Sequence, residues 1–445
     1  MNKINLLLQI FLLFTYIYLI QCQNPGFDTT IDQYANINKI NNDAGNGFSV
    51  LYNNWYKIIH NQKTNQSYVV TFQGQKPPTL TEPFANAIYV NTTDIQSIGI
   101  MNANVAIPYL ELLELNNKVT YTNDKESITS NCMASLAPTN TASLVISNST
   151  FVGNNITTIS FSPDDSMTPI QKSSWLVYLS YFFDKEQDAI NRLQNIQSIY
   201  YCHKDNLAKA GAQSIAFVRY ENNAWSVETS YYYQTLVTEA GMTLYNGSHH
   251  TLHEAQFIVD LSSPKTGITY SAWQAALTYV DPDATSFIQS KNIYRIDRLV
   301  NAAGFPDWTE RASVRSDLMI QDIIHMVYST YQPSYPSTWL RNYIKNDPTK
   351  LTNEPNNYPV CTDISSQFHE SKCEFNRFDP KDPSTGSSGQ GSSSPNNGNG
   401  LSIGGKIGVA LGVIVIVVIL TIGGFFYYQR KKSAPTHTFY KMNDI

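Results

Sequence analysis

The sequence predicts an α/β protein built from two α/β lobes that are joined by one long α-helix. Strands and helices alternate in two separate blocks, within residues 95–146 and residues 214–296, as expected for parallel sheets covered by helices. Between these blocks, apolar side chains recur at helical spacing over residues 184–208. At about 1.5 Å per residue this helix would span roughly 37 Å, which is enough to cross between two lobes.

A β-hairpin is predicted ahead of the first lobe. Residues 48–60 are rich in Val, Tyr, Trp and Ile, a polar turn follows at 63–65, and residues 68–72 resume the strand pattern. The first lobe then follows with one helix among short strands. We expect strands at 95–101, 118–122 and 143–146, and a helix at 107–115.

The middle of the chain is predicted to be helical. The apolar residues of a first helix fall on one face: Trp175, Tyr178, Leu179, Phe182 and Phe183. Asp184 followed by Gln187 resembles a capping box and predicts the start of the long helix, which Gly211 ends. The second lobe is then predicted to contain strands at 214–220, 257–261 and 292–296, and helices at 231–240, 272–279 and 317–328.

Both ends of the chain carry targeting patterns. Lys3 precedes an uncharged, mostly apolar run that ends at Ile20, which is typical of a signal peptide cleaved near Cys22. Residues 407–428 form a second uncharged run, of the length that a bilayer of about 30 Å requires. The basic residues that follow it predict a cytoplasmic tail, and therefore a single-pass type I protein of the plasma membrane with an extracellular N-terminus.

These patterns give a domain organisation. We expect a signal peptide at 1–22, an N-terminal hairpin and α/β lobe at 23–172, helices including the interlobe helix at 173–210, a C-terminal α/β lobe at 211–374, a Ser/Gly/Asn/Pro-rich stalk at 375–405, a transmembrane helix at 406–428 and a cytoplasmic tail at 429–445. Gly408 and Gly412 lie four residues apart in the transmembrane segment and would allow two such helices to dimerise.

Cysteine and asparagine usage is consistent with export. Four cysteines remain after signal removal, Cys132, Cys202, Cys361 and Cys373, and an even number in an oxidising compartment predicts two disulfides. Three pairings are open; proximity in sequence favours Cys361–Cys373, which leaves Cys132–Cys202. Five Asn-x-Ser/Thr sites predict glycosylation, at Asn65, Asn91, Asn148, Asn155 and Asn246. The net charge of −5 provides no electrostatic footprint for nucleic acid.

Several stretches resemble the class III solute-binding proteins, the two-lobed family that includes bacterial siderophore and cobalamin binders. The resemblance extends over residues 48–345 and lies in the order of the elements together with residues 107–115, 118–122, 175–186, 293–297, 307–308 and 315–322. It implies two α/β lobes around a cleft and a small ligand such as a metal chelate or siderophore-like molecule. The predicted C-terminal membrane helix departs from that family.

The candidate ligand-binding residues lie after strands, where loops of α/β lobes bind ligands. In the first lobe these are Asn102 and Asn104, and in the second Arg219, Tyr220 and Trp225. The matching position in the resembled family adds Trp308, Arg311 and Arg315. Arginine can bind acidic groups and the aromatic rings can stack on a planar ligand. In the alternative interpretation, the tryptophans are core residues and the arginines form structural ion pairs.

Other chemistry is weakly indicated. His249, His250 and His253 form the densest imidazole cluster, but a solvated loop explains them better than a metal site, and no metal ligands are predicted. Asp164 and Asp165 are likewise interpreted as part of a loop. The sequence contains no Gly-x-Ser-x-Gly, His-Glu-x-x-His or phosphate-loop motif, so we predict a protein that is not an enzyme, with no cofactor assigned.

Two main functions therefore remain open, with an extracellular enzyme as a weaker third. The first is a cell-surface protein that binds a small molecule in an interlobe cleft. The second is an adhesion or structural glycoprotein, or a signalling receptor, without a small-molecule ligand. An open cleft with converging Arg and Trp would favour the first, and a filled cleft would favour the second.

Overall fold

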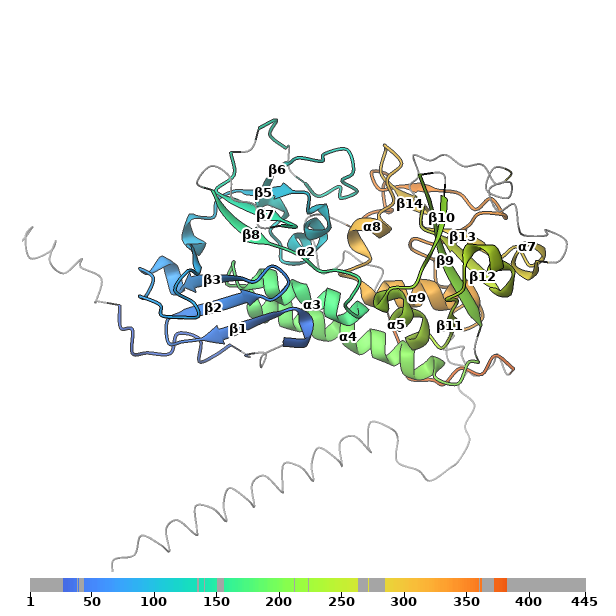
Figure 1. Ribbon diagram of the computed structural model, residues 1–445, viewed down its shortest axis with the longest axis horizontal. Helices are drawn as coiled ribbons and strands as arrows, with labels where there is room; N and C mark the ends of the chain where they lie inside the picture. Colours follow the sequence, from blue (N-terminus) through green and yellow to red (C-terminus); the bar gives the residue numbers. More distant parts are fainter. Residues whose placement is uncertain are drawn as a thin grey trace, which may run out of the picture. The chain divides into compact units, whose positions relative to one another are not determined.

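The computed structural model describes residues 27–37, 39, 44–133, 136–139, 141–149, 156–211, 213–222, 224–262, 271, 285–359, 361 and 372–381. Within the compact unit of residues 1–388, two α/β lobes have separate hydrophobic cores (Figure 1). The predicted fold class of two lobes joined by a helix is confirmed. The predicted signal peptide, transmembrane helix and tail lie outside the described residues, and none of the described helices is long and apolar enough to span a bilayer.

The first lobe contains two four-stranded sheets. The first sheet, in the order β1-β2-β3-β4, is formed by β1 (Phe48–Tyr52), β2 (Tyr56–Asn61), β3 (Gln66–Thr71) and β4 (Ile88–Val90). The second sheet is parallel, in the order β6-β5-β7-β8, and is formed by β5 (Ile98–Met101), β6 (Val119–Thr122), β7 (Leu144–Ser147) and β8 (Thr157–Ser160). Helix α2 (Ile107–Leu112) follows β5. The single strand predicted over 48–60 is wrong, because the chain reverses where the Asn53 N–H donates to the Tyr56 carbonyl.

Helix α3 (Pro169–Ser180) begins with a capping box that the sequence analysis missed. Thr168 Oγ1 accepts a bond from the Gln171 N–H at 3.1 Å, and Gln171 Oε1 accepts one from the Thr168 N–H at 2.8 Å. These two bonds satisfy backbone donors that a helix start leaves unpaired. The signal was present in the sequence as Thr168-Pro-Ile-Gln171.

The long interlobe helix is α4 (Glu186–Leu207), and it contributes to both cores. Its first half buries Ala189, Ile190 and Leu193 in the first lobe, and its second half buries Tyr200 and Leu207 in the second. Each fully buried side chain of this size contributes roughly 1.5–3 kcal/mol. Helix α4 packs against α3 and against α9, and α3 and α9 also contact each other (Figure 1).

The capping box predicted at Asp184 and Gln187 is wrong. Asp184 adopts a φ of +52° and accepts a hydrogen bond from Lys57 Nζ at 2.9 Å, so its carboxylate does not cap α4. Lys57 lies on β2 with no exposed surface and also pairs with Glu186 in the first turn of α4. A buried ammonium requires counterions, and this requirement takes precedence over helix capping.

The second lobe is formed around one mixed sheet. Its main path is β10-β9-β12-β13-β15, and β11 pairs with β9. The strands are β9 (Ser214–Glu221), β10 (Ala224–Glu228), β11 (Thr243–Leu244), β12 (Phe257–Asp260), β13 (Ile293–Arg295) and β15 (Arg341–Asn342), with a separate pair β14 (Leu299–Val300) and β16 (Lys350–Leu351). The helices are α5 (Tyr231–Glu239), α7 (Ser286–Gln289), α8 (Trp308–Arg311) and α9 (Ser316–Val327). The predicted strands and the helices at 231–240 and 317–328 are confirmed, and the helix predicted at 272–279 lies outside the described residues.

Both disulfides cross large parts of the chain, so the pairing favoured from sequence proximity is wrong. Cys132 is bonded to Cys361, and Cys202 is bonded to Cys373. The first connects a loop of the first lobe to the segment that follows β16. The second fixes the end of the folded unit to α4, where Asn206 Nδ2 also donates to the Glu374 carbonyl at 2.8 Å and Phe378 is buried.

Two glycines at the ends of helices provide a matched test of the packing around α4. Gly241 has a φ of +79°, and a Cβ placed there would lie 2.4 Å from the Leu207 carbonyl oxygen; Gly211 has a φ of +94° with nothing within 4 Å of such a Cβ. We expect Gly211→Ala to cost about 1 kcal/mol through backbone strain alone. Gly241→Ala should cost a further ~1–3 kcal/mol because the backbone of α4 must move.

The measurement is the urea midpoint of the full-length protein carrying each substitution. Equal midpoints for the two variants would contradict the close approach of Gly241 to the end of α4.

Candidate functional site

A cavity of about 190 Å³ lies where the two lobes meet, and its lining includes Arg219 and Trp308, two of the residues predicted to bind a ligand. Arg219, Leu261 and Ile296 place it at the carboxyl ends of β9, β12 and β13. Both β11 and β12 follow β9 in sequence and pair directly with it. Ligands of open α/β sheets bind at this edge, where successive connections diverge from one strand.

The first lobe and α3 supply a charged wall of the cavity. Lys172 pairs with the Asp165 carboxylate, and its Nζ stands 3.9 Å from the centre of the Tyr232 ring. The backbone also joins the two sides, because the Tyr232 N–H donates to the Asp165 carbonyl at 3.1 Å. Asp165 lies in a loop, as predicted, whereas Lys172 was not predicted, because its position depends on how α3 packs against α5.

Arg219 provides the second cation of the cavity. Its Nη1 lies 3.3 Å from a Glu221 oxygen, and its side chain remains 37% exposed. A guanidinium has five N–H donors, so this single ion pair leaves capacity for a ligand. Tyr232, Tyr233 and Trp308, all buried, form an aromatic wall of the cavity. Because Lys172 is already paired with Asp165, the spare donors of Arg219 beside these rings are the groups that can hold a compact molecule with an acidic group.

Tyr220 and Trp225 do not line this cavity. They face each other across the β9–β10 pair, with ring centres 5.1 Å apart, and Trp225 is buried in a small third core of the second lobe. Their role in the structure is to pack the hairpin, as the alternative interpretation of Trp225 expected.

Asn102 and Asn104 hold the loop that follows β6. The Asn102 N–H donates to Asn123 Oδ1 at 2.9 Å, and Asn123 Nδ2 donates back to Asn102 Oδ1 at 2.7 Å. Asn104 Nδ2 donates to the Asp124 carbonyl and to Ser127 Oγ, each at 2.7 Å. The two asparagines therefore position a loop that continues to Thr129, and this loop contacts the second lobe.

A buried polar network connects that loop to α8. Thr129 Oγ1 lies 2.8 Å from Asp307 Oδ1 and 2.6 Å from Glu310 Oε2, so its one hydroxyl proton is shared between these two carboxyl groups, and its N–H donates to the same Glu310 oxygen at 3.0 Å. Arg311 pairs with Asp307, with Nε to Oδ2 at 2.8 Å, and lies 4.6 Å from the Tyr358 ring. Arg311 is thus enclosed in the contact between the lobes.

Two carboxyl groups of this network have strongly raised pKa values. Burial raises the pKa of Glu310 to about 8, opposed by hydrogen bonds from Thr129, and raises that of Glu111 to about 7, opposed by bonds from Ser130 and by the charge of Arg311. Tyr358 donates to Glu111 Oε2 at 3.0 Å. Glu310 Oε1 is buried and has no hydrogen-bond partner among the described residues. We refer to Glu111, Thr129, Asp307, Glu310, Arg311 and Tyr358 as the interlobe network.

The remaining predicted residues lie apart from the cavity. Arg315 forms a two-bond pair with Asp317 at 2.8 and 2.7 Å, and both residues are buried. The histidine cluster lies in a short 3₁₀ helix (His249–Glu254), and the described residues contain no group of three or more ligands suited to a metal. Asn65, Asn148 and Asn246 are exposed, Asn91 is half-buried, and Asn155 lies outside the described residues.

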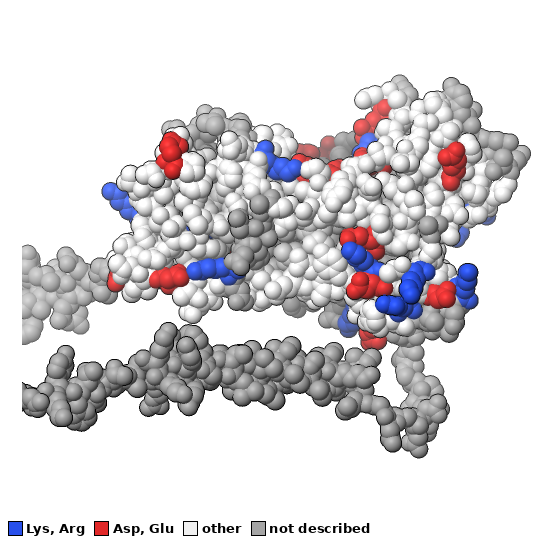
Figure 2. Space-filling view, turned by 60° about the horizontal axis from the view of Figure 1, so that its bottom comes forward, with Lys and Arg blue, Asp and Glu red and all other residues white. Residues whose placement is uncertain are grey.

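One face of the molecule can be judged for patches of surface charge in Figure 2. On the face shown in Figure 2, the Lys and Arg side chains of the described residues lie close to Asp and Glu rather than in an extended patch of one sign. Charged residues make up 15% of the chain.

Comparisons with known proteins return similarities only among solved structures. No protein-family model matches this chain. No curated protein matches it either. A periplasmic binding protein from Veillonella parvula is 10% identical with a TM-score of 0.40, covering 53% of this chain and 92% of its own. The haem-binding protein HutB of Vibrio cholerae is 14% identical with a TM-score of 0.41, covering 52% of this chain and 99% of its own. The petrobactin-binding protein YclQ from Bacillus subtilis is 12% identical with a TM-score of 0.38, covering 53% of this chain and 93% of its own. Similarities this low assign neither a family nor a ligand to the chain.

The interlobe network predicts a stability that falls as pH rises. Burial raises the pKa values of Glu111 and Glu310 above the ordinary value of 4.5, so the folded state binds their protons more tightly than the unfolded chain does. The stabilisation that these two carboxyl groups provide is complete below pH 4.5. It is lost as the pH rises through about 7 for Glu111 and about 8 for Glu310. We expect the free energy of unfolding of the full-length protein to decrease between pH 6 and pH 9.

The substitution Glu310→Gln should flatten that dependence, since an amide resembles the protonated carboxyl and does not ionise. Glu254→Gln, at an exposed position, is the control and should leave the slope unchanged. Urea titrations at pH 6, 7, 8 and 9 provide the measurement. An unchanged slope in Glu310→Gln would rule out this carboxyl as its source.

Proposed function

We propose that this protein is a cell-surface, single-pass type I membrane glycoprotein whose interlobe cavity binds a compact anionic molecule. The observation that carries the proposal is the convergence of Arg219, Lys172 and Trp308 on one cavity at the carboxyl ends of the strands. The export and anchoring parts rest on the apolar runs near the two ends and on the five Asn-x-Ser/Thr sites.

The size of the cavity narrows the class of ligand. Pockets for drug-sized ligands hold about 300–1,000 Å³, whereas this cavity holds about 190 Å³. A small carboxylate or phosphate ester with a planar or apolar body matches that volume and the aromatic wall. A haem, cobalamin or ferric siderophore is too large for this cavity. A metal chelate of that size could bind only after the lobes had separated into a more open conformation.

A second function is favoured by a specific observation. The interlobe network and the Cys132–Cys361 disulfide hold the first-lobe loop against α8 and the segment after β16, which fills much of the contact between the lobes. A cleft filled in this way suits an adhesion or structural glycoprotein that keeps the fold without a small-molecule ligand. Ligand binding distinguishes the two functions.

We expect small aromatic carboxylates or phosphate esters to stabilise the full-length protein by about 2.7 kcal/mol when the free ligand is at a hundred times its Kd. This stabilisation should be measurable as a rise in the melting temperature. Arg219→Ala should weaken that binding at least tenfold, because it removes the guanidinium that faces the cavity. Arg192→Ala is the matched control, since this arginine pairs with Glu114 away from the cavity.

The screen also includes haem, cobalamin and a ferric siderophore. A lack of stabilisation by any compound, or equal affinity in Arg219→Ala and the wild type, would contradict ligand binding at this cavity and favour the adhesion function.

The proposed topology predicts a one-sided pattern of epitope exposure. An epitope placed after Ile445 should bind antibody only after permeabilisation, whereas one placed after Gly26 should bind on intact cells. Endoglycosidase treatment should lower the apparent mass, and the combined substitution of the five sequon asparagines by Gln should remove that change. A C-terminal epitope that is accessible on intact cells would overturn the topology.

A further inference from the structure

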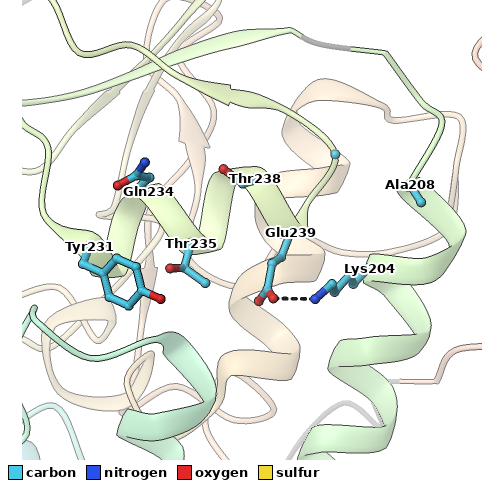
Figure 3. A pocket seen from close by; sticks show the side chains of 8 residues that line it. Lys204, Ala208, Tyr231, Gln234, Thr235, Thr238 and Glu239 are labelled. Atoms are coloured by element: carbon cyan, nitrogen blue, oxygen red, sulfur yellow. Dashed lines mark hydrogen bonds and ion pairs between the residues drawn. The ribbon is translucent and has the colours of Figure 1, made fainter. Parts of the chain in front are cut away.

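A groove on the second lobe forms a larger cavity than the one between the lobes. It lies between the C-terminal half of α4 and α5 and has a volume of about 440 Å³ (Figure 3). None of its lining residues is shared with the interlobe cavity. Its volume falls within the range of about 300–1,000 Å³ that is typical of small-molecule sites. The groove is therefore a second potential site and is independent of the proposed function.

A fixed ion pair spans the groove and leaves it electrically neutral. Lys204 Nζ of α4 lies 2.6 Å from Glu239 Oε1 of α5 (Figure 3). The Tyr200 hydroxyl donates to the other oxygen of Glu239, Oε2, at 2.7 Å. Both oxygens of Glu239 are thus held in place before any ligand arrives. Close approach of the Gly241 backbone to Leu207 fixes the spacing of the two helices at this end.

The other polar side chains along α5 are available to a ligand. Those of Tyr231, Gln234, Thr235 and Thr238 make no hydrogen bond to any residue that the structure describes. They offer hydroxyl and amide groups, each of which can both donate and accept. In Figure 3, Thr235 lies between Tyr231 and Glu239 along the helix.

One exposed aromatic ring, that of Tyr231, lines this groove, and a second, that of Tyr201, lies near the lining residue Lys204. Tyr231 is 53% exposed and Tyr201 is 42% exposed, and they are two of the five large hydrophobic side chains that stand exposed in the described part of the chain. Tyr201 and Lys204 are three residues apart on one face of α4, and the Lys204 ammonium lies 5.5 Å from the Tyr201 ring. Tyrosine provides a flat apolar surface together with a polar hydroxyl.

We propose that this groove binds a neutral, hydroxyl-rich ligand of the size of a mono- or disaccharide. A charged ligand would meet no unbalanced charge, because Lys204 and Glu239 neutralise each other. A pyranose presents hydroxyls that can form hydrogen bonds with the side chains of Thr235 and Gln234. Its other hydroxyls can bond to the remaining lone pairs of the Glu239 carboxylate and the remaining protons of the Lys204 ammonium. Its apolar ring face stacks on Tyr231.

The test measures binding of glucose, galactose, maltose, cellobiose and diacetylchitobiose to the full-length protein, treated first with endoglycosidase. Saturation-transfer NMR identifies a bound sugar and isothermal titration gives its Kd. We expect a Kd in the millimolar range or tighter for at least one sugar. Tyr231→Ala should weaken it at least tenfold, Thr235→Val should weaken it severalfold, and Tyr231→Phe should retain most of it because the stacking ring remains.

Leu51→Ala is the matched control, since Leu51 is 52% exposed on β1 of the first lobe. It should bind sugar as the wild type does. The proposal is overturned if none of the sugars binds, or if Tyr231→Ala binds them with wild-type affinity. The second outcome would place any sugar binding elsewhere on the chain.

Discussion

The carboxylate of Asp307 is the contact on which the arrangement of the lobes depends. It is fully buried and accepts bonds from Thr129 of the first lobe, Arg311 of α8 and Trp339 of the segment before β15, the last at 2.7 Å. An isolated carboxylate in such surroundings would cost several kcal/mol. Arg311 balances its charge, and the neutral donors complete its hydrogen bonds. Loss of any one partner would leave a buried charge incompletely satisfied, so three distant segments are constrained together.

This constraint also determines how much space remains for a ligand. The loop that carries Thr129 packs against α8, and the cavity beside Lys172, Arg219 and Trp308 lies at the same helix. A ligand larger than this cavity requires a wider separation of the lobes, and loss of the Thr129–Asp307 bond is one change that such a separation would involve. Such a change exposes both Asp307 and Glu310, whose oxygens share the same hydroxyl donor. The buried network therefore contributes to the close contact between the two lobes next to the cavity.

The features that the sequence predicted well are those that depend on local pattern. Apolar periodicity located α4 and most strands, and the position of Arg219 at a strand end placed it at the cavity. Arg311 and Arg315 carry the same side chain, yet each is paired with a nearby carboxylate, Asp307 or Asp317. The Asp307–Arg311 spacing of four residues is a signal for a helical ion pair that could have been used.

Other features depend on tertiary contacts that sequence spacing does not report. Lys172 reaches the cavity because α3 packs beside α5, and no local pattern encodes this contact. The disulfides join residues separated by 229 and 171 positions, whereas proximity in sequence favours the shortest loop. Likewise, Asp184 is of a residue type that commonly caps helices, but its carboxylate accepts a hydrogen bond from the buried ammonium of Lys57 instead.

Helix α4 limits the ways in which the lobes can separate. Its N-terminus is fixed by the buried pair of Lys57 and Glu186, and its C-terminal half by the Cys202–Cys373 disulfide and the burial of Tyr200. Bending this helix would disturb apolar contacts in both cores at roughly 1.5–3 kcal/mol for each side chain exposed. Releasing the Thr129 loop breaks hydrogen bonds worth about 0.5–1.5 kcal/mol each, and up to about 3 where a charged group accepts them. It also leaves the Asp307 carboxylate without one of its donors, while the Cys132–Cys361 disulfide keeps the end of the loop attached to the segment after β16. Both changes therefore oppose separation of the lobes, and ionisation of the buried Glu310 would lower the cost of releasing the loop.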